Sequence, residues 1–236
     1  MDFRVLTVDD DPATLLVMEK ALSSAGFEVW AAISGEAGLE VLRRRGLPHL
    51  VVIDLLMPGM GGLDFCRQIK AWSDVPLIVV TSVSAKETLI DMIERFAEDY
   101  IVKPFDPREL GARAKRIMHR MGTLAYSLEP VTAVDGYLSV DFVHQRAILD
   151  GREVELGPLE NKLLYLLMKG AGRPQTNAQL IGRLWPNQEV FDDTLRVHIH
   201  RLRRKIEPRP EAPRYVVTER GVGYSFPPRA GGVAVR

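Results

Sequence analysis

The stretch "FRVLTVDDDPATLL", residues 3–16, decides how the N-terminal half of the chain folds. Its apolar run up to Val8 is typical of a buried strand, and Asp9, Asp10 and Asp11 follow at once. Pro12 opens a helical pattern, so Asp11 is the expected N-cap and Pro12 the first helical position. Carboxylates crowded at the end of a buried strand repel one another and lose solvation. The crowding therefore indicates either a solvated loop or a divalent cation site.

The alternation of strand and helix continues to about residue 121. Strand patterns occur at residues 4–8, 28–32, 50–53, 77–81 and 100–102, and helical patterns occur at residues 12–25, 35–45, 61–71, 86–97 and 107–121. Strands that alternate with helices predict a parallel sheet covered on both faces. Five such units predict an α/β, flavodoxin-like (CheY-like) doubly wound fold with a five-stranded parallel sheet.

Polar side chains follow four of these strands. Asp9 and Asp10 follow the first, Asp54 ends the third, Thr81 ends the fourth, and Lys103 follows the fifth. Each alone is readily explained as a helix cap or a solvated charge, but the fold brings all of them to one edge of the sheet. Asp54 is then a possible nucleophile toward phosphorus, Thr81 a hydrogen-bond donor and Lys103 a positive charge for phosphoryl oxygens. The carboxylates suit Mg²⁺, so the set predicts phosphoryl transfer.

Residues 1–120 resemble the receiver domain of two-component response regulators. The resemblance is carried by "VDDD", "IDLLMPGMGG", "VTS" and "DYIVKPF". It implies that Asp54 is the phosphoacceptor and a sensor histidine kinase the donor. It implies Mg²⁺ ligands from Asp10, Asp54 and the backbone carbonyl of Leu56, with Asp9 in the outer coordination sphere.

The resemblance also implies a switch and a dimer. Thr81 and Tyr100 would be the switch pair, and Lys103–Pro104 would carry a cis peptide. Phosphorylation would produce a homodimer through charged residues at the positions Asp99, Glu109, Arg113 and Arg120. Here "IERFAEDY" replaces the usual "GLEAGADDY", and Leu89 stands where a basic residue is common, so at least one ion pair is expected to be missing. A solvated, charged helix face is the alternative.

The second half of the chain has a different character. Residues 1–120 carry 15 basic and 18 acidic side chains, a net of −3, whereas residues 121–236 carry 16 and 13, a net of +3. The expected organisation is a receiver domain at 1–121, a linker at 122–134, an α+β winged helix-turn-helix domain at 135–228 and a tail at 229–236. The expected elements are strands with a turn at Asp150–Gly151, helices at 158–169, 177–184 and 192–206, and a closing hairpin with its bend at Gly221 and Gly223.

The third of these helices carries the functional signal. Asp192 or Asp193 is the expected cap, and apolar residues recur at helical spacing as a core stripe. Val197, His200, Arg201 and Arg204 fall on the opposite face. A charged outer face is often only solvated, but this one lacks acidic partners and follows a short helix, which is typical of a recognition helix for the major groove of double-stranded DNA.

The motifs "RVHIHRLRRKI" and "TERGVGYSF" make the second half similar to the winged-helix output domain of OmpR/PhoB-type regulators. The resemblance implies base contact by Arg201, with Val197, His200 and Arg204 nearby, and a wing whose Arg220 enters the minor groove. Phosphate contacts would come from Thr194, His198 and Thr218. Gly157 and Arg196 depart from the family, which favours Thr and Asp there. The loop "PNQEVF" is short; in this family that loop can touch RNA polymerase, which is an expected partner.

The sequence thus predicts a phosphorylation-controlled transcription regulator rather than an enzyme. Two alternatives are an Asp-nucleophile phosphohydrolase and a DNA binder with a decayed receiver. Leu56 stands where such a hydrolase needs a second acid, and the receiver residues are all present, so both are disfavoured. No apolar stretch of about 18 residues suggests a membrane span. The single cysteine, Cys66, fits a reducing, cytoplasmic setting.

Overall fold

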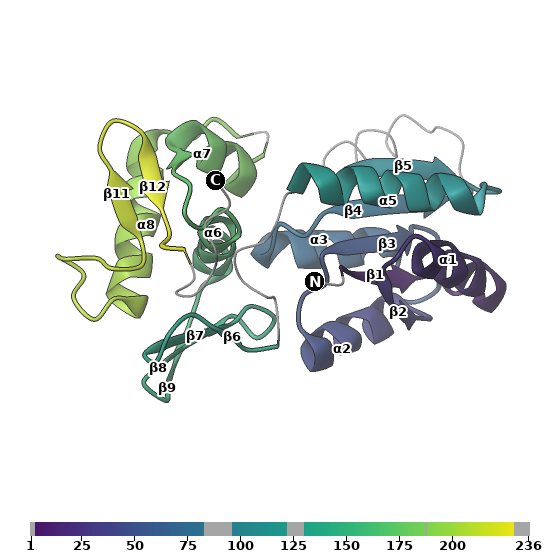
Figure 1. Ribbon diagram of the computed structural model, residues 1–236, viewed down its shortest axis with the longest axis horizontal. Coiled ribbons are helices and arrows are strands. Elements are labelled where there is room, and N and C mark those ends of the chain that lie inside the picture. The colour runs from purple at the N-terminus through teal and green to yellow at the C-terminus, as the bar shows by residue number, and fades with distance from the viewer. Residues whose placement is uncertain (1–2, 83–95, 122–129, 187, 229–236) are drawn as a thin grey trace. The chain divides into compact units, whose positions relative to one another are not determined.

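The computed structural model describes residues 3–82, 96–121, 130–186 and 188–228. They fall into two compact units, the first holding the residues up to Gly122 except 71–74 and the second holding 71–74 and the residues from Thr123 onward (Figure 1). The expected helix at 86–97 lies outside the described residues, apart from its last two.

The first unit is built on five parallel strands in the order β2-β1-β3-β4-β5. The strands are β1 (Arg4–Val8), β2 (Glu28–Ala32), β3 (Leu50–Asp54), β4 (Leu77–Thr81) and β5 (Asp99–Val102). The central strands are buried along their whole length, as continuous Val, Ile and Leu runs predict. The order reverses beside β1, so the predicted flavodoxin-like fold is confirmed.

Helices cover both faces of this sheet. On one face, α1 (Pro12–Ser24) and α5 (Pro107–Met121) pack side chains such as Met18 and Ile117 against Val5 and Val52. On the other lie α2 (Gly35–Arg45) and α3 (Gly62–Trp72), where Gly38 lets Phe65 approach Val8 (Figure 1). Alternate strand residues thus enter separate cores, and the sheet is fixed from both sides.

The start of α1 follows from local chemistry. The Asp11 carboxylate accepts hydrogen bonds from the backbone N–H groups of Ala13 and Thr14 and from the Thr14 hydroxyl. Pro12 occupies the first turn, where its missing N–H costs nothing. Asp11 is therefore a helix cap, as expected, which separates its role from those of Asp9 and Asp10.

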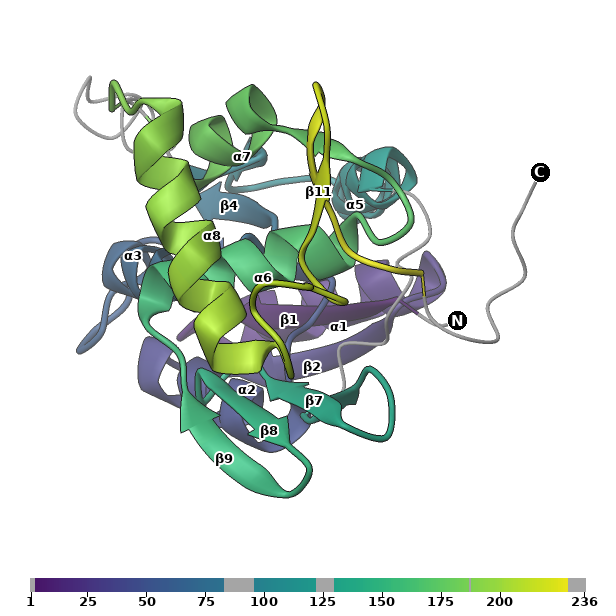
Figure 2. The same ribbon diagram turned by 90° about the vertical axis from the view of Figure 1, so that its left-hand side faces the viewer.

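The second unit combines two small sheets with three helices. An antiparallel sheet has the order β6-β7-β8-β9, and a second has the order β10-β12-β11. The strands are β6 (Thr132–Ala133), β7 (Leu138–Asp141), β8 (Arg146–Leu149), β9 (Arg152–Glu155), β10 (Gln175–Thr176), β11 (Val217–Glu219) and β12 (Gly223–Ser225). The helices are α6 (Pro158–Lys169), α7 (Asn177–Leu184) and α8 (Asp192–Ile206). Figure 2 shows α8 and the β11–β12 hairpin, which confirm the predicted winged helix.

Two local expectations for this unit need correction. The N-cap of α8 is Phe191, which makes no side-chain cap; Asp192 and Asp193 lie in the first turn, where their charge favours the helix dipole. In the hairpin, Gly221 lies at the bend with φ of 76°, but Gly223 begins β12. A Cβ on Gly223 would lie 2.1 Å from the carbonyl oxygen of Gln175, so Gly223 admits the neighbouring strand β10.

The remaining turn agrees with its sequence. Asp150 and Gly151 both have positive φ, 49° and 79°, as a two-residue hairpin between β8 and β9 requires. Among the helices of the described residues, none combines the length and the apolar character needed to span a bilayer.

Candidate functional site

Three carboxylates meet at the carboxyl ends of β1 and β3. Asp9, Asp10 and Asp54 each place one oxygen so that all three oxygens lie within 4.8 Å of one another. Asp9 and Asp54 are buried, whereas Asp10 is exposed. We call these three residues the acidic edge. The parallel pairing of Val8 with Ile53 brings the two strand ends side by side.

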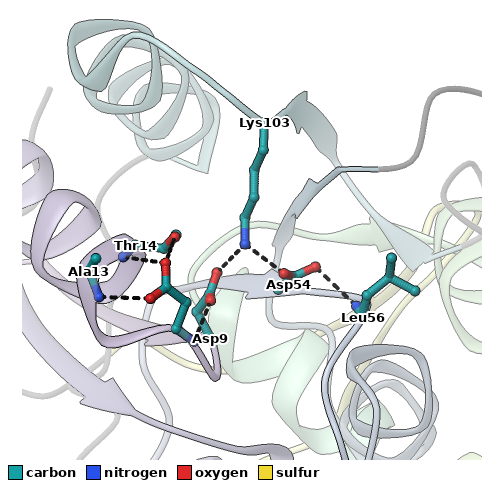
Figure 3. A network of polar contacts seen from close by, with 7 residues as sticks. Asp9, Ala13, Thr14, Asp54, Leu56 and Lys103 are labelled. Atoms are coloured by element: carbon teal, nitrogen blue, oxygen red, sulfur yellow. Dashed lines mark hydrogen bonds and ion pairs between the residues drawn. The ribbon is translucent and has the colours of Figure 1, made fainter.

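Lys103 joins two of the three carboxylates of the acidic edge (Figure 3). Its Nζ lies 2.6 Å from Asp9 Oδ2 and 2.6 Å from Asp54 Oδ2. The lysine follows β5, and its Nζ partly offsets the charge of two carboxylates that come from distant parts of the chain. The sequence predicted this convergence of groups, but not that Lys103 would join the two carboxylates.

The pKa values reflect this pairing. Burial raises the pKa of Asp9, and the hydrogen bond from Lys103 only partly opposes it. Burial also acts against the charge of Lys103, but its hydrogen bonds to Asp54 and Asp9 outweigh burial and raise the pKa of Lys103. Lys103 is therefore a firmly charged ammonium group at neutral pH.

The loop after β3 is fastened around Asp54. The Leu56 N–H donates to Asp54 Oδ1 at 3.0 Å, and the Gly62 N–H donates to the Leu55 carbonyl. Glu36 of α2 accepts the Met60 N–H at 2.8 Å, a contact that sequence reasoning missed. A Cβ on Gly62 would lie 1.9 Å from the Asp54 carbonyl oxygen, so only glycine allows this return.

The donors of the acidic edge fit a hard divalent cation. The donors are carboxylate oxygens, which Mg²⁺ prefers. Asp10 is exposed, so water molecules could supply the remaining ligands of an octahedral Mg²⁺ ion. A pocket of about 440 Å³ adjoins the site on the side of Lys103 and α1, with Ala13, Val17 and Phe105 among its walls.

Two expected switch residues differ in exposure. Thr81, at the end of β4, is 1% exposed, whereas the Tyr100 side chain of β5 is 52% exposed. The two residues lie diagonally on adjacent strands, two positions out of register, since Thr81 pairs with Val102 and Val79 with Tyr100. The peptide bond between Lys103 and Pro104 is cis, as expected.

The charges expected at a dimer interface pair within the chain. Arg113 of α5 donates to Asp99 at 2.7 Å and also to Glu109, and Arg116 donates to the second oxygen of Asp99 at 2.7 Å. Arg116 was missed by the sequence analysis, although it lies three residues after Arg113 and so on the same side of the helix. The Arg120 side chain lies outside the described residues.

The outer face of α8 presents the predicted recognition residues. Leu195, Ile199, Leu202 and Ile206 are buried. The opposite side exposes the five residues Thr194, Val197, His200, Arg201 and Arg204, which we call the recognition face. Three of these residues, His200, Arg201 and Arg204, carry cationic or titratable groups. Val197 adds an apolar side chain, and this residue is 47% exposed.

His198, an expected phosphate contact, lies differently. Its ring packs against Trp185 with 5.3 Å between centroids, and its Nδ1 is buried without a hydrogen-bond partner among the described residues. Burial lowers the pKa of His198, so the ring is neutral at neutral pH. The other expected contacts of the hairpin, Thr218 and Arg220, are both exposed.

A hollow of about 570 Å³ lies between the hairpin and the first turns of α7 and α8. Arg196 and Thr218 lie on its walls, together with two acidic residues whose carboxylates are engaged. Asp192 accepts from the Asn177 amide, and Glu219 accepts from the Ser225 hydroxyl. The hollow opens between the two elements that carry the predicted DNA contacts.

Comparisons with known proteins agree with both halves of the molecule. Residues 5–115 match the family model described as "Response regulator receiver domain". Residues 151–226 match the one described as "Transcriptional regulatory protein, C terminal".

The relatives align along nearly the whole chain. The chain is 36% identical over 223 residues to the sensory transduction protein RegX3 of Mycobacterium tuberculosis, covering 94% of this chain and 98% of the relative. It is 33% identical over 229 residues to the probable transcriptional regulator ycf27 of Cyanophora paradoxa, covering 94% and 95%. Among solved structures, the response regulator DrrB, described as a Thermotoga maritima OmpR/PhoB homologue, is 30% identical with a TM-score of 0.46, covering 96% and 100% of the two chains.

Proposed function

Because the chain belongs to the OmpR/PhoB family of two-component response regulators, we propose that it takes a phosphoryl group on Asp54 and thereby gains affinity for promoter DNA. The observation that carries this proposal is the acidic edge, with the Lys103 ammonium 2.6 Å from both Asp9 and Asp54. Three carboxylates around one fixed ammonium group suit a divalent cation, and that cation together with Lys103 would compensate the charge of an incoming phosphoryl dianion.

Asp10, Asp54 and the Leu56 carbonyl would hold Mg²⁺, with Asp9 in its outer coordination sphere. The bound ion would supply charge compensation for the phosphoryl oxygens. Asp9 supports this assignment because it is buried yet already engaged by Lys103 and by the Asp11 N–H at 3.0 Å. Asp10 has an exposed carboxylate and suits direct coordination.

The chemical step needs little beyond positioning. A carboxylate oxygen of Asp54 attacks the phosphorus of a phosphohistidine on a sensor kinase, and the P–N bond breaks as the new P–O bond forms. The electron pair of the broken bond leaves with the imidazole. Leu56 holds the Asp54 carboxylate through its N–H, so that the other oxygen is turned toward Lys103 (Figure 3).

The response is a shift between two conformations of the sheet edge. The Thr81 hydroxyl and Lys103 would move to the phosphoryl oxygens, and the exposed ring of Tyr100 would turn inward behind Thr81. The surface of β5 and α5 would then form a homodimer. Asp99, Glu109 and Arg113 would exchange their internal pairs for pairs with the second chain, together with Arg120.

The DNA contacts belong to α8 and the hairpin. The recognition face would enter the major groove, with Arg201 bidentate to a guanine and Val197, His200 and Arg204 beside it. Arg220 would lie in the minor groove, while Thr194, His198 and Thr218 would contact phosphates, with His198 donating as a neutral ring. The loop before α8, where Phe191 is 78% exposed, is the proposed contact for RNA polymerase.

Selection from a randomised duplex pool tests the proposal. The full chain is used with and without Mg²⁺ and a small acyl phosphate donor, as wild type, Asp54→Ala and Asp64→Ala. Asp64 is a matched control, since it is an exposed carboxylate of α3 paired only with Arg67 among the described residues. Wild type and Asp64→Ala should enrich a repeated motif more strongly with the donor, whereas Asp54→Ala should not. Equal enrichment by all three proteins, whatever the donor, would contradict the proposal.

A further inference from the structure

Arg203 differs from the other arginines of α8. Arg201 and Arg204 are exposed, but the Arg203 guanidinium is turned toward the hairpin strand and half-buried. Its Nε and Nη2 both donate to the Val216 carbonyl, at 2.9 and 2.6 Å. Nη2 also donates to the Thr218 hydroxyl at 2.8 Å. Three hydrogen bonds therefore join one side chain of the recognition helix to the strand that enters the hairpin.

Glu207, the C-cap residue of α8, binds the same segment. Its carboxylate accepts from the N–H groups of Tyr215 and Val216, at 2.9 and 2.7 Å, and from the Arg214 N–H at 2.8 Å. Glu207 is only 6% exposed. The N–H of Val216 thus donates to Glu207, the C-cap residue of α8, and the carbonyl of Val216 accepts from Arg203 of the helix itself.

The held segment is the base of the hairpin. Val216 directly precedes β11, which pairs with β12 and leads to the bend that carries Arg220. The Arg203 guanidinium also lies 5.9 Å from the centre of the Tyr224 ring, on the opposite strand of the hairpin. The Arg203 guanidinium therefore contacts residues of both strands of the hairpin, Thr218 and Tyr224.

We propose that Arg203 and Glu207 form a clamp that fixes the hairpin on the recognition helix, so that Arg201 and Arg220 meet one duplex at the same time. Arg203 is then a positioning residue and not a contact to DNA phosphate. The inference rests on the proposed DNA binding by α8 and the hairpin. If the inference holds, the Arg203 side chain helps to set the distance between the residues that contact the major groove and those that contact the minor groove.

The side-chain chemistry explains why arginine is needed there. A guanidinium offers several donors in a rigid plane and can bind two acceptors at once, whereas an ammonium is a point charge on a flexible stem. Burial lowers the pKa of Arg203, yet a guanidinium keeps its charge under such desolvation. Lysine at this position would keep a charge for a phosphate contact but would lose the fork.

That difference gives a direct test with the full chain. Arg203→Lys is compared with Arg209→Lys, an exposed arginine in the segment after α8, in binding to the duplex selected by the wild type. Arg220→Ala and the double variant complete a cycle. We expect Arg203→Lys and Arg220→Ala each to weaken binding about tenfold, and the double variant no more than either, since an unplaced wing has no contact left to lose. Arg209→Lys should bind within about twofold of wild type.

Footprinting gives a second measurement. In Arg203→Lys, minor-groove protection of the A·T-rich flank should fade while major-groove protection persists. The clamp would be overturned if Arg203→Lys bound the duplex with wild-type affinity, a result that would indicate a phosphate contact instead. It would also be overturned if the affinity losses of the two single variants added up in the double variant. If Arg203→Lys and Arg203→Gln were both unfolded at the assay temperature, a local role would also be excluded. If Arg203→Lys and Arg201→Ala both bound the duplex with wild-type affinity, the proposed DNA-binding face itself would be refuted.

Discussion

At the scale of single residues, Lys103 determines the electrostatics of the proposed phosphorylation site. Asp9 has no exposed side-chain surface and Asp54 very little, and the ammonium between them forms an ion pair with each. Removing one partner of a buried ion pair leaves an uncompensated charge, which costs far more than an exposed pair is worth.

We therefore expect Lys103→Met to lower the free energy of unfolding by about 3 kcal/mol. Mg²⁺ should restore much of the loss, because a divalent cation would replace the missing charge at the same oxygens. Urea unfolding with and without Mg²⁺ measures both effects. Lys115→Met, an exposed lysine of α5, is the control and should change little. A Lys103→Met variant as stable as wild type without Mg²⁺ would contradict the assigned role.

Cys66 provides a residue-scale test of the core of the first unit. Burial raises the pKa of its thiol to about 12, and the side chain is 1% exposed. Because the thiolate is the reactive form and the pKa is raised, the native thiol stays protonated below about pH 12. An aromatic disulfide reagent at pH 8 should react slowly with native protein and fast in denaturant. Rapid stoichiometric labelling of the native chain would contradict this packing.

At the scale of elements, close approach of backbones decides where glycine is required. Gly62 allows the loop after β3 to return against Asp54, and Gly223 allows β12 to lie against β10. Both glycines position proposed functional groups, the first at the acidic edge and the second in the hairpin. A methyl group at either position meets backbone rather than a mobile side chain.

Gly223→Ala should consequently destabilise the second unit by about 1–3 kcal/mol, since an inserted methyl in a tight contact forces backbone shifts. Its control is Gly182→Ala on α7, where no atom lies within 4 Å of the added Cβ and alanine favours the helix. Thermal unfolding measures the stability of the two variants, and DNA affinity measures whether the hairpin still binds. If the two variants behaved alike, the close contact between β10 and β12 would be wrong.

The proposed dimer surface is also an element-scale matter. The carboxylate of Asp99 is held by two arginines of α5 within one chain. Exchanging these internal pairs for pairs between chains changes little in total charge compensation. Dimerisation would therefore be set by the burial of apolar neighbours and by the Tyr100 rotamer rather than by the ion pairs.

At the scale of the whole molecule, the proposed function is a coupling between two ligands, a phosphoryl group on one unit and DNA on the other. Linkage makes such a coupling reciprocal for binding free energies. Beryllofluoride, which binds reversibly to an aspartate in place of a phosphoryl group, allows both directions to be measured at equilibrium.

If beryllofluoride with Mg²⁺ raises the affinity for the selected duplex by a given factor, the duplex should raise beryllofluoride affinity by the same factor. Coupling of 1–3 kcal/mol, about 5–150-fold, is typical of such systems. Calorimetric titrations of the full chain check both directions, with Asp54→Ala as the control that should show neither. A strong effect of beryllofluoride on DNA binding without the reverse effect would mean that the two sites are not linked through one equilibrium.

The sequence by itself determined the order of the described strands and helices of the first unit, the Asp11 cap, the doubly wound fold and the identity of the acidic edge. These follow from local patterns: apolar periodicity defines each element, and the parallel topology places every strand end at one edge. The buried residues of α8 and the residues of its outer face could be predicted from the sequence for the same reason. Side chains one helical turn apart share a face whatever surrounds the helix.

Only the tertiary structure decided which of these groups touch. Lys103 meets Asp9 and Asp54 across 94 and 49 residues of sequence, and the Arg203 side chain of α8 donates to the Val216 carbonyl. Neither Asp192 nor Asp193 caps α8, because the helix begins at Asp192 itself. Such outcomes depend on the three-dimensional positions of backbone groups that no periodic pattern encodes. The sequence does not distinguish the exposed Arg201 from Arg203, which binds the hairpin segment. The two differ because the Val216 carbonyl lies beside Arg203 in the folded chain.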